Sequence, residues 1–369
     1  MQTTILIPAY RPDEHLIRLA EALTGQYGLR CVIVDDGSGP EFRELFDEAA
    51  MTGSTILAHS SNHGKGAAIK TGIAWIRREY PDTAYIITAD ADGQHLPEDI
   101  ARLAKVAMEN ETLSPLILGV RCFLLPQVPL RSRLGNRFSS FYFRLSTGVR
   151  CPDTQTGLRA IPRRLFALAL ATPGERYEFE MQFLMAAARE GALTYVPITT
   201  VYETGNKSSH FNTVRDSVRI YKTPLKYVGS SLICAAADLL VFAVLTRILG
   251  SGAGFVWAAT VLARILSGCL NFMLNRSWSF SGNRASEGNA ARQAVRYGIL
   301  FVAIMCASAL CVSMLSALPI PLVLTKAVVD TALSVISYLA QLNWVFKRPE
   351  GLPAGRRSRL LYTEKADFH

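Results

Sequence analysis

Short apolar runs and longer amphipathic stretches alternate over the first 200 residues of the chain. The runs are rich in β-branched residues, which favours strands, and the stretches between them have helical spacing. The expected strands lie in TTILIPAY (3–10), RCVIVDDGSG (30–39), STILAHS (54–60) and TAYIITADADG (83–93), and helices in 13–25 and 62–80. Strands that alternate with helices predict a parallel sheet covered by helices on both faces.

The pattern changes at Tyr227, after which charged residues become rare. No charged residue lies between Arg296 and Lys326, and Arg264 alone interrupts the uncharged stretch from Ile248 to Asn275. A soluble helix needs a polar face, whereas a helix that crosses a bilayer needs about 20 apolar residues. The sequence therefore predicts four membrane spans, at about 228–248, 254–275, 297–317 and 321–343.

Basic residues are placed unevenly around these spans. They occur between spans two and three and after span four, at Arg276, Arg284, Arg292, Arg296, Lys347 and Arg348. The other two connections, GSGAGF and ALPIP, are uncharged, and Arg247 is the one basic residue on that side. The positive-inside rule then places both termini and the middle connection in the cytoplasm. The N-terminus lacks the basic region of a secretory signal, which agrees with a cytoplasmic first domain.

The apolar part contains an internal repeat. NFMLNRSWSF (271–280) and SYLAQLNWVF (337–346) share an aromatic residue and a Trp-x-Phe ending at an offset of 66 positions. Each copy ends a pair of spans, so we expect two repeated hairpins. Upstream, residues 211–226 combine basic and apolar faces, which predicts an amphipathic helix lying on the membrane.

Composition adds few constraints to this picture. The chain has 369 residues, 50% hydrophobic residues, and a net charge of +9. This length allows two domains. The seven cysteines form no CxxC pair, so they indicate reduced thiols and no metal–thiolate site.

Candidate chemistry gathers where the predicted strands end. Asp35-Asp36 and Asp90-Ala91-Asp92 follow two strands, and the carboxyl ends of parallel strands meet at the ligand-binding edge of a sheet. Two adjacent carboxylates repel each other unless a positive charge lies between them. An EF-hand starting at Asp90 fails because His95 and Ala101 stand where Gly and Glu are required. A solvated turn and a divalent metal shared with a bound ligand remain as interpretations of the two carboxylates.

Two common nucleotide-binding motifs are absent from the sequence. The segment NHGKG (62–66) does not satisfy the P-loop pattern, and no GxGxxG follows the first strand, which argues against a dinucleotide cofactor.

Several motifs in order resemble those of family-2 glycosyltransferases. They are ILIPAY, VIVDDGS, NHGKGAAIKTGI, ADADGQH, GVR and DTQTGLRAIPRR, and the resemblance as a whole covers about residues 3–226. The chain is most similar to the polyprenyl-phosphate type, represented by dolichol-phosphate mannose synthase, and its apolar part resembles the four-helix GtrA-like membrane domain. The resemblance implies a GT-A fold, Rossmann-like with a mostly parallel sheet, a nucleotide-sugar donor, and Mg²⁺ or Mn²⁺ at the DxD motif.

The same resemblance implies roles for individual residues. Catalytic roles fall on Asp90, Asp92, Gln94, Arg121, Asp153 and Gln155. Nucleotide-sugar binding falls on Pro8, Tyr10, Val34, Asp35, Asp36, Lys65, Asp90, Ala91, Asp92, Lys207 and His210, and the metal on Asp92 and Asp90. Arg11-Pro12 replaces the Asn-Glu that often follows this Tyr in the family, so Arg11 could face the nucleotide. Glu178 and Glu180 begin a helix and are expected to interact with its dipole.

The acceptor implied by the resemblance needs positive charge more than a base. A phosphate monoester has a second pKa near 6, so at pH 7 it is already a dianionic nucleophile. Arg131, Arg133 and Arg137 lie on a predicted helix whose apolar residues Leu130, Leu134, Phe138, Phe141 and Leu145 recur at helical spacing. We expect these arginines to bind the acceptor phosphate at a membrane surface. The alternative is an ordinary surface helix.

The expected domains are a cytoplasmic GT-A domain (1–210), a juxtamembrane helix (211–226), a GtrA-like domain (227–346) and a cytoplasmic tail (347–369). The expected activity is inverting transfer of a sugar to polyprenyl (undecaprenyl) phosphate at the inner membrane, and UDP-glucose, GDP-mannose and UDP-N-acetylglucosamine all fit. Partners could include a second copy, a flippase and a downstream glycosyltransferase. The alternatives are a translocator of the lipid-linked sugar, an inactive scaffold, and a processive polysaccharide synthase, whose Gln-x-x-Arg-Trp motif is absent.

Four charged residues lie within the predicted spans: Asp238, Arg264, Lys326 and Asp330. Charges at bilayer depth are costly, so they should pair with one another or face a polar path. The spacing permits Asp238 with Arg264 and Lys326 with Asp330, and binding of the lipid phosphate is the alternative.

Overall fold

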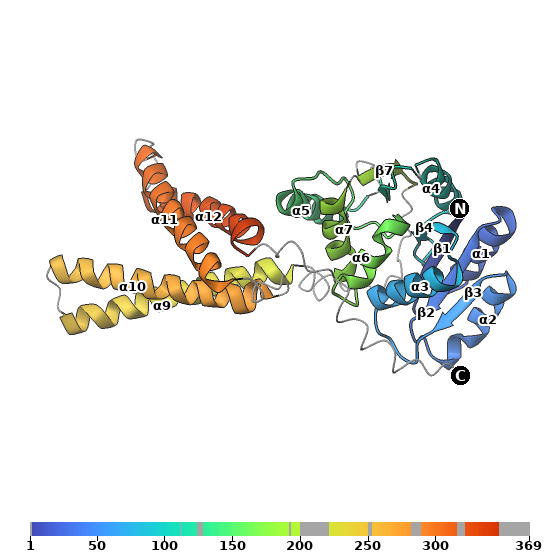
Figure 1. Ribbon diagram of the computed structural model, residues 1–369, viewed down its shortest axis with the longest axis horizontal. Coiled ribbons are helices and arrows are strands. Elements are labelled where there is room, and N and C mark those ends of the chain that lie inside the picture. The colour runs from blue at the N-terminus through green and yellow to red at the C-terminus, as the bar shows by residue number, and fades with distance from the viewer. Residues whose placement is uncertain are drawn as a thin grey trace. The chain divides into compact units, whose positions relative to one another are not determined.

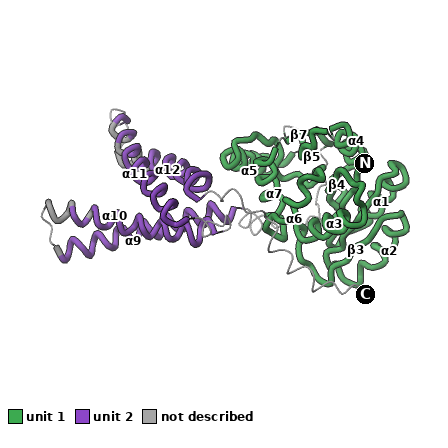
Figure 2. The backbone as a smooth tube through the Cα atoms, in the orientation of Figure 1, with its two compact units in different colours: residues 1–220, 353–369 green, residues 221–352 purple. Residues whose placement is uncertain are grey.

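The computed structural model describes residues 2–110, 112–123, 128–191, 193–199, 221–249, 253–281, 289–315 and 322–346. The chain divides into two compact units at Tyr221, coloured separately in Figure 2. The first unit is an α/β domain and the second is entirely helical in its described residues. The predicted juxtamembrane helix 211–226 and the tail 347–369 lie mostly or wholly outside the described residues.

A seven-stranded sheet forms the centre of the first unit (Figure 1). Its strands run in the order β3-β2-β1-β4-β6-β5-β7. Their bounds are β1 Gln2–Ala9, β2 Arg30–Asp35, β3 Thr55–Ala58, β4 Thr83–Thr88, β5 Leu116–Val120, β6 Arg159–Pro162 and β7 Leu193–Pro197. Neighbouring strands are parallel except on both sides of β6. The predicted mostly parallel, Rossmann-like GT-A sheet is therefore confirmed.

Helices cover both faces of this sheet, as the alternating pattern predicts. Their bounds are α1 His15–Glu21, α2 Arg43–Met51, α3 Lys65–Glu79, α4 Pro97–Glu109, α5 Leu130–Thr147, α6 Phe166–Ala171 and α7 Glu178–Glu190. One buried apolar cluster joins a face of the sheet to α1, α2 and α4, and a second joins the other face to α3, α5, α6 and α7. The first unit thus has three layers.

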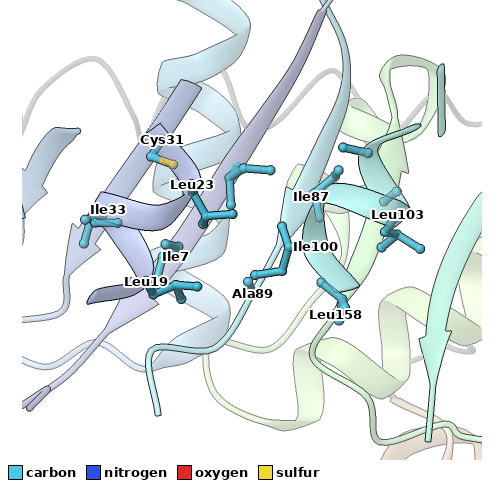
Figure 3. Close-up of a cluster of buried hydrophobic side chains, with 14 of the residues drawn as sticks. Ile7, Leu19, Leu23, Cys31, Ile33, Ile87, Ala89, Ile100, Leu103 and Leu158 are labelled. Atoms are coloured by element: carbon cyan, nitrogen blue, oxygen red, sulfur yellow. The ribbon is translucent and has the colours of Figure 1, made fainter. Parts of the chain in front are cut away.

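The central strands contribute side chains to both clusters because successive side chains of a strand point to opposite faces of the sheet. Ile5 and Ile7 of β1 lie in the first cluster, whereas Leu6 between them lies in the second. Figure 3 shows Ile7 and Ile87 from neighbouring strands beside Leu19 of α1 and Leu103 of α4. These strands are apolar on both faces, as strands of a covered parallel sheet must be.

Helix α5 has an unusual distribution of side chains. Its buried positions include Asn136, Ser139, Phe143 and Ser146. Four of its large apolar residues instead face outward: Leu130, Leu134, Phe138 and Phe141 are each 58–72% exposed. An exposed apolar face of this kind marks a surface that contacts a partner or a membrane.

The second unit contains four long helices among its described residues. They are α9 Lys222–Leu249, α10 Ala253–Leu274, α11 Ala290–Leu315 and α12 Leu322–Ala340, and each overlaps one of the four predicted spans. Within the described residues, Lys222–Ile248 and Ala290–Ser308 are long and apolar enough to cross a membrane. Each of α10 and α12 ends in a π-helical turn, Asn275–Ser279 and Gln341–Val345, at corresponding positions of the sequence repeat.

Candidate active site

The candidate site lies where the order of strands in the sheet reverses. From β1 the chain proceeds outward through β2 and β3, then returns to place β4 on the other side of β1. Ligands bind beyond the carboxyl ends of strands at such a switch point. Tyr10 follows β1 here and Asp90 follows β4 closely, so the structure brings together the strand ends that the sequence predicts.

Lys65, the first residue of α3, connects two carboxylates in this site. Its Nζ lies 2.6 Å from Asp90 Oδ1 and 3.2 Å from Glu180 Oε2 at the start of α7. Burial alone would lower the pKa of Lys65, but the charges of Asp90 and Glu180 outweigh it and raise that pKa well above its usual range. For Asp90, burial works in the opposite direction and raises the pKa. The charge of the Lys65 ammonium more than offsets this effect, and the pKa of Asp90 falls to about 2. Both groups are therefore charged at neutral pH.

Asp92 has the opposite electrostatic balance. Burial raises its pKa, the negative charge of Asp90 raises it further, and the result is about 6. Its Oδ1 accepts a hydrogen bond from the backbone N–H of Gln94 at 3.2 Å. The surroundings of Asp92 consequently disfavour its negative charge, and a bound cation would stabilise that charge.

His95 fixes the backbone of the same loop. Its Nδ1 accepts a hydrogen bond from the backbone N–H of Asp90 at 2.9 Å. The side chain is 6% exposed, and burial lowers its pKa, so the ring is neutral with its proton on Nε2. His95 thereby holds the loop in the conformation that presents Asp90 and Asp92.

A second charged pair lies beside this loop. Arg121 donates from Nε to Asp153 Oδ2 at 2.8 Å and from a terminal nitrogen to Oδ1 at 3.1 Å. Asp153 is fully buried and also accepts from the backbone N–H of Gln155 at 3.1 Å. This bidentate contact fixes the plane of the Arg121 guanidinium. The charge of Arg121 also contributes to the low pKa of Asp90, which links the two clusters.

The predicted nucleoside side of the site is packed more tightly. Asp36 is 2% exposed, and its carboxylate accepts hydrogen bonds from His59 Nδ1 and from the backbone N–H groups of His63 and Gly64 at 2.7–2.9 Å. Asp35 accepts from the backbone N–H of Ser38. The structure thus shows Asp36 holding the loop before α3, and its contact with a nucleoside stays a prediction.

The remaining predicted nucleotide residues occupy two environments. Pro8 and Val34 are buried within β1 and β2, whereas Tyr10 and Ala91 are half-buried at the strand ends. The Arg11 guanidinium lies 5.4 Å from the centre of the Tyr10 ring. Lys207 and His210 lie outside the described residues.

Two glycines permit close packing around Asp90 and Lys65. A Cβ at Gly157 would overlap the Asp90 carboxylate. Gly64 has φ +105°, and a Cβ there would meet Arg176 Cγ and Glu175 O. These positions bring the DTQTGLR segment (153–159) and the start of α7 against the acidic loop, so a larger side chain would separate the charged groups.

The predicted acceptor residues are at the surface. Arg131 and Arg137 are exposed on α5 and Arg133 is half-buried. All three lie on the helix whose apolar side chains point outward. Their role toward an acceptor stays a prediction.

The side chains of the site can be compared with the ligands that the divalent metal implied by the resemblance would need. Among the described residues no group of three or more His, Cys, Asp or Glu could enclose a metal ion. Mg²⁺ and Mn²⁺ need fewer protein ligands where a substrate diphosphate completes their shell. Two carboxylates one residue apart, one of them with a raised pKa, fit such a shared ion.

Sequence reasoning missed Glu180 and His95 as site residues. Glu180 is assigned from sequence to the helix dipole alone, but the structure brings it to Lys65, which lies 115 positions earlier. Only the three-dimensional packing of α7 on α3 reveals that contact. His95 is adjacent to the DxD motif, so its place in ADADGQH was the available signal.

Comparisons with known proteins identify both parts of the chain. The profile of glycosyl transferase family 2 matches residues 4–166, and the GtrA/DPMS transmembrane domain matches residues 205–346. An uncharacterized protein of Methanocaldococcus jannaschii is 30% identical over 224 residues, covering 59% of this chain and 89% of that protein.

Relatives with assigned names share the same region. Polyprenol monophosphomannose synthase of Mycolicibacterium smegmatis is 27% identical over 230 residues, covering 59% of this chain and 84% of the relative. The UDP-N-acetylglucosamine–dolichyl-phosphate N-acetylglucosaminyltransferase of Methanococcus voltae is 29% identical over 217 residues, covering 54% and 85%. Among solved structures, glucosyl-3-phosphoglycerate synthase from Mycobacterium tuberculosis, in complex with Mn²⁺ and UDP, aligns with a TM-score of 0.45 and 14% identity over 61% of this chain and 76% of that one.

Proposed function

The chain belongs to glycosyl transferase family 2 and carries a GtrA/DPMS transmembrane domain, and we propose that it transfers a sugar from a nucleotide-sugar to polyprenyl phosphate. The product would be a lipid-linked monosaccharide for cell-envelope glycosylation. Relatives named for transfer to polyprenol or dolichyl phosphate support a lipid phosphate as the acceptor.

Asp90, Asp92 and Lys65 would bind the diphosphate of the donor. Lys65 neutralises Asp90 before any ligand arrives, whereas Asp92 keeps a carboxylate whose charge a cation would stabilise. Asp92, with Asp90 beside it, would hold Mg²⁺ or Mn²⁺, which supplies positive charge to the departing nucleoside diphosphate. The protein's part is to hold these carboxylates at a fixed separation, which His95 and Gly157 make possible.

The acceptor phosphate would be the nucleophile. One of its oxygens forms a bond to the anomeric carbon while the bond from that carbon to the diphosphate breaks, and the diphosphate leaves with the electron pair. A single displacement of this kind inverts the anomeric centre. A dianionic nucleophile needs no strong base, so the chain's task is to orient it with fixed positive charge. Arg121 suits this task because Asp153 fixes its guanidinium, with the arginines of α5 nearby in sequence.

The membrane unit would cross the bilayer as two hairpins and keep the transferase unit in the cytoplasm. Arg276 follows α10 directly, and Arg292 and Arg296 lie in the first two turns of α11, so basic residues gather at this end of the helices and support this orientation. The outward apolar face of α5 would lie in the interface beside the acceptor's head group.

The observation that carries this proposal is the Asp90–Lys65–Glu180 cluster with Asp92 beside it, at the strand switch point. The test is to incubate the full-length protein in membranes with a panel of radiolabelled nucleotide sugars and undecaprenyl phosphate, and to follow label into the lipid phase. Label should enter with one donor in preference to the others. Loss of labelling in Asp92→Asn, with labelling kept in the exposed control Asp47→Asn, would tie it to this site. No lipid label from any donor would contradict the proposal.

A further inference from the structure

Two basic side chains of the second unit occupy matching places beside its π-helical turns. The unit contains two hairpins, α9–α10 and α11–α12, and the helices of each hairpin lie side by side (Figure 1). Lys226, in the second turn of α9, donates from Nζ to the backbone oxygen of Trp278 at 3.0 Å. Arg296, in the second turn of α11, donates to the backbone oxygen of Trp344 at 2.9 Å. The two hairpins therefore repeat the same contact.

The internal repeat of the sequence relates these two contacts. Trp278 and Trp344 are 66 positions apart, which is the offset of the repeat, and Lys226 and Arg296 are 70 positions apart. Each cation also lies 5.8 Å from the centre of its tryptophan ring. Lysine and arginine differ in shape and share a positive charge with several N–H donors. The repeat thus preserves a cation beside an indole ring.

One part of this requirement is structural. Trp278 and Trp344 lie in the π-helical turns that follow α10 and α12, where backbone carbonyl groups lack a partner within the helix. A basic side chain can bind such a carbonyl and interacts favourably with the negative end of the helix. This contact uses one donor of each cation, whereas an ammonium group has three N–H donors and a guanidinium has five. Capping therefore leaves donors for a second ligand.

The charges in the middle of the helices are matched within the unit. Arg264 Nε lies 3.7 Å from Asp238 Oδ2, and Ser308 donates to Asp330 Oδ1 at 2.5 Å. These polar groups line a cavity of roughly 650 Å³ between the hairpins. The predicted pairing of Asp238 with Arg264 is present, while the side chain of Lys326 lies outside the described residues.

The two cations at the helix ends are not matched in this way. In the described part of the second unit the carboxylates are Asp238 and Asp330, which lie inside the helices, and neither forms an ion pair with Lys226 or Arg296. The two tryptophans are 39% and 40% exposed, and their indole N–H groups have no hydrogen-bond partner among the described residues. Each pair therefore presents an uncompensated positive charge and an available indole donor.

These features together favour an anionic lipid as the ligand. Tryptophan is typical of the level of the lipid head groups, because its ring is apolar and its N–H is polar. Apolar side chains continue from each cation along the same helix face. Ile233 lies seven positions after Lys226 and Ile299 three positions after Arg296, and they are 47% and 56% exposed. A phosphate bound to the cation and the indole N–H would thus have apolar surface beside it for acyl chains.

We propose that Lys226 with Trp278, and Arg296 with Trp344, form two equivalent sites for the phosphate of an anionic phospholipid at one surface of the bilayer. Each site joins the first helix of a hairpin to the turn that ends the second helix, so a bound lipid would hold the two helices together. The inference requires the helical unit to lie in a membrane, and it does not depend on the proposed sugar transfer.

The test counts the lipids bound to the full-length protein by native mass spectrometry after its release from detergent micelles. Two molecules of phosphatidylglycerol should bind, each about tenfold more tightly than phosphatidylcholine, whose head group carries a compensating positive charge. Lys226→Gln and Arg296→Gln should each weaken one site about tenfold or more, the usual effect of losing a hydrogen bond to a charged group, and the double variant should weaken both. Arg292→Gln, which removes an exposed charge from the first turn of α11, is the matched control and should keep both sites.

Two conservative changes separate a lipid site from a helix cap. Lys226→Arg keeps the charge and should keep both lipids, which excludes misfolding as the cause of the loss in Lys226→Gln. Trp278→Phe keeps the ring and the backbone oxygen that Lys226 caps, but it removes the indole N–H. This variant should weaken lipid binding at one site about twofold to tenfold.

Three results would overturn the inference. Equal binding of phosphatidylglycerol and phosphatidylcholine, or equal losses in Arg292→Gln and Arg296→Gln, would show a diffuse effect of charge. Two tightly bound lipids in the double variant would leave Lys226 and Arg296 as helix caps only. Displacement of both lipids by an equimolar amount of undecaprenyl phosphate would assign the two sites to that carrier instead.

Discussion

The carboxylates of the candidate site differ in whether a positive side chain lies beside them, and this difference sets the pKa of each. Asp90 and Glu180 share the ammonium of Lys65, whereas Asp92 has its pKa raised to about 6 by burial and by Asp90. A site that binds a diphosphate and a dication gains from such an imbalance. Asp90 stays ionised without ligand, and under the proposed function Asp92 would attract the metal.

Replacing Asp92 tests the metal assignment. We expect Asp92→Asn to lower transfer by about a hundredfold or more, because a neutral amide stabilises a dication and the departing diphosphate poorly. The fold should persist, since Asp92 accepts its hydrogen bond from the backbone of its own loop. A lipid-label assay would measure the transfer activity, and circular dichroism would show whether the fold persists. EDTA should likewise abolish transfer by the parent, and Mn²⁺ or Mg²⁺ should restore it. Undiminished transfer by Asp92→Asn in excess EDTA would exclude the assignment.

The raised pKa of Asp92 also predicts a pH dependence. As pH falls through about 6, Asp92 gains a proton and loses the charge that a metal needs. Affinity for Mn²⁺ in the presence of UDP should therefore fall across this interval, while Asp90, with a pKa of about 2, stays ionised. Isothermal titration from pH 5 to 8 would measure the affinity. The same pH profile in Asp92→Asn would assign the titration to another group.

Removing Lys65 tests the neutralisation of Asp90. Lys65→Met leaves two largely buried carboxylates without their shared cation, which should cost about 3–5 kcal/mol of the free energy of unfolding. In the parent, the low pKa of Asp90 contributes stability above the ordinary Asp pKa of about 3.9, and this is lost as pH falls toward 2. In Lys65→Met a carboxylate can gain a proton at higher pH, so the deficit should shrink between pH 7 and 5. Urea unfolding at both pH values measures it, with exposed Lys105→Met as the control.

At the scale of elements, α5 combines two surfaces with different tasks. Its polar side packs inward, where Asn136 donates to the backbone oxygen of Pro152 at 2.7 Å, next to the Asp153 that fixes Arg121. Its apolar side faces outward with Arg131 and Arg137 among the exposed residues. One helix could therefore connect a membrane surface to the acceptor side of the site.

The arginines of α5 should affect the acceptor and not the donor. If they bind the acceptor phosphate, Arg131→Ala and Arg133→Ala should each raise the KM for polyprenyl phosphate about tenfold to a hundredfold. The KM for the nucleotide sugar should change little. Arg43→Ala, on exposed α2, is the matched control. Steady-state kinetics that show a changed donor KM and an unchanged acceptor KM would place these arginines at the diphosphate instead.

Hydrophobic periodicity predicted the strands and helices whose apolar residues recur at regular spacing. It missed elements and contacts that depend on residues distant in the sequence. The strands β1 to β4 and the helices α1 and α3 follow from hydrophobic periodicity, whereas α2 between β2 and β3 was not predicted. β6 has four residues, Arg159–Pro162, and exists because β4 and β5 flank it in antiparallel pairing. The contact of Glu180 with Lys65 depends likewise on α7 packing near α3, which spacing along the chain does not encode. The buried, loop-holding position of Asp36 also appears only in three dimensions.

The whole molecule combines an α/β unit of glycosyl transferase family 2 with a helical unit that matches a membrane domain. The first unit has a complete three-layer core of its own. The second matches the GtrA/DPMS transmembrane domain, exposes large apolar side chains along its helices, and contains the polar cavity between its hairpins. The orientation of the second unit in the bilayer decides which compartment each connection between its helices faces.

The positive-inside rule predicts that orientation, and the prediction can be measured at two positions. Arg247, near the end of α9, is on the side with uncharged connections, and Ser281, after the π-helical turn that follows α10, is on the side with Arg276 and Arg292. Because basic residues stay on the cytoplasmic side, the two positions should face opposite compartments. In a chain whose native cysteines are replaced by serine, a membrane-impermeant maleimide added to intact cells should label Arg247→Cys and spare Ser281→Cys. Inverted vesicles should give the reverse. Labelling of both from one side would show that α9 and α10 do not form a hairpin across the membrane.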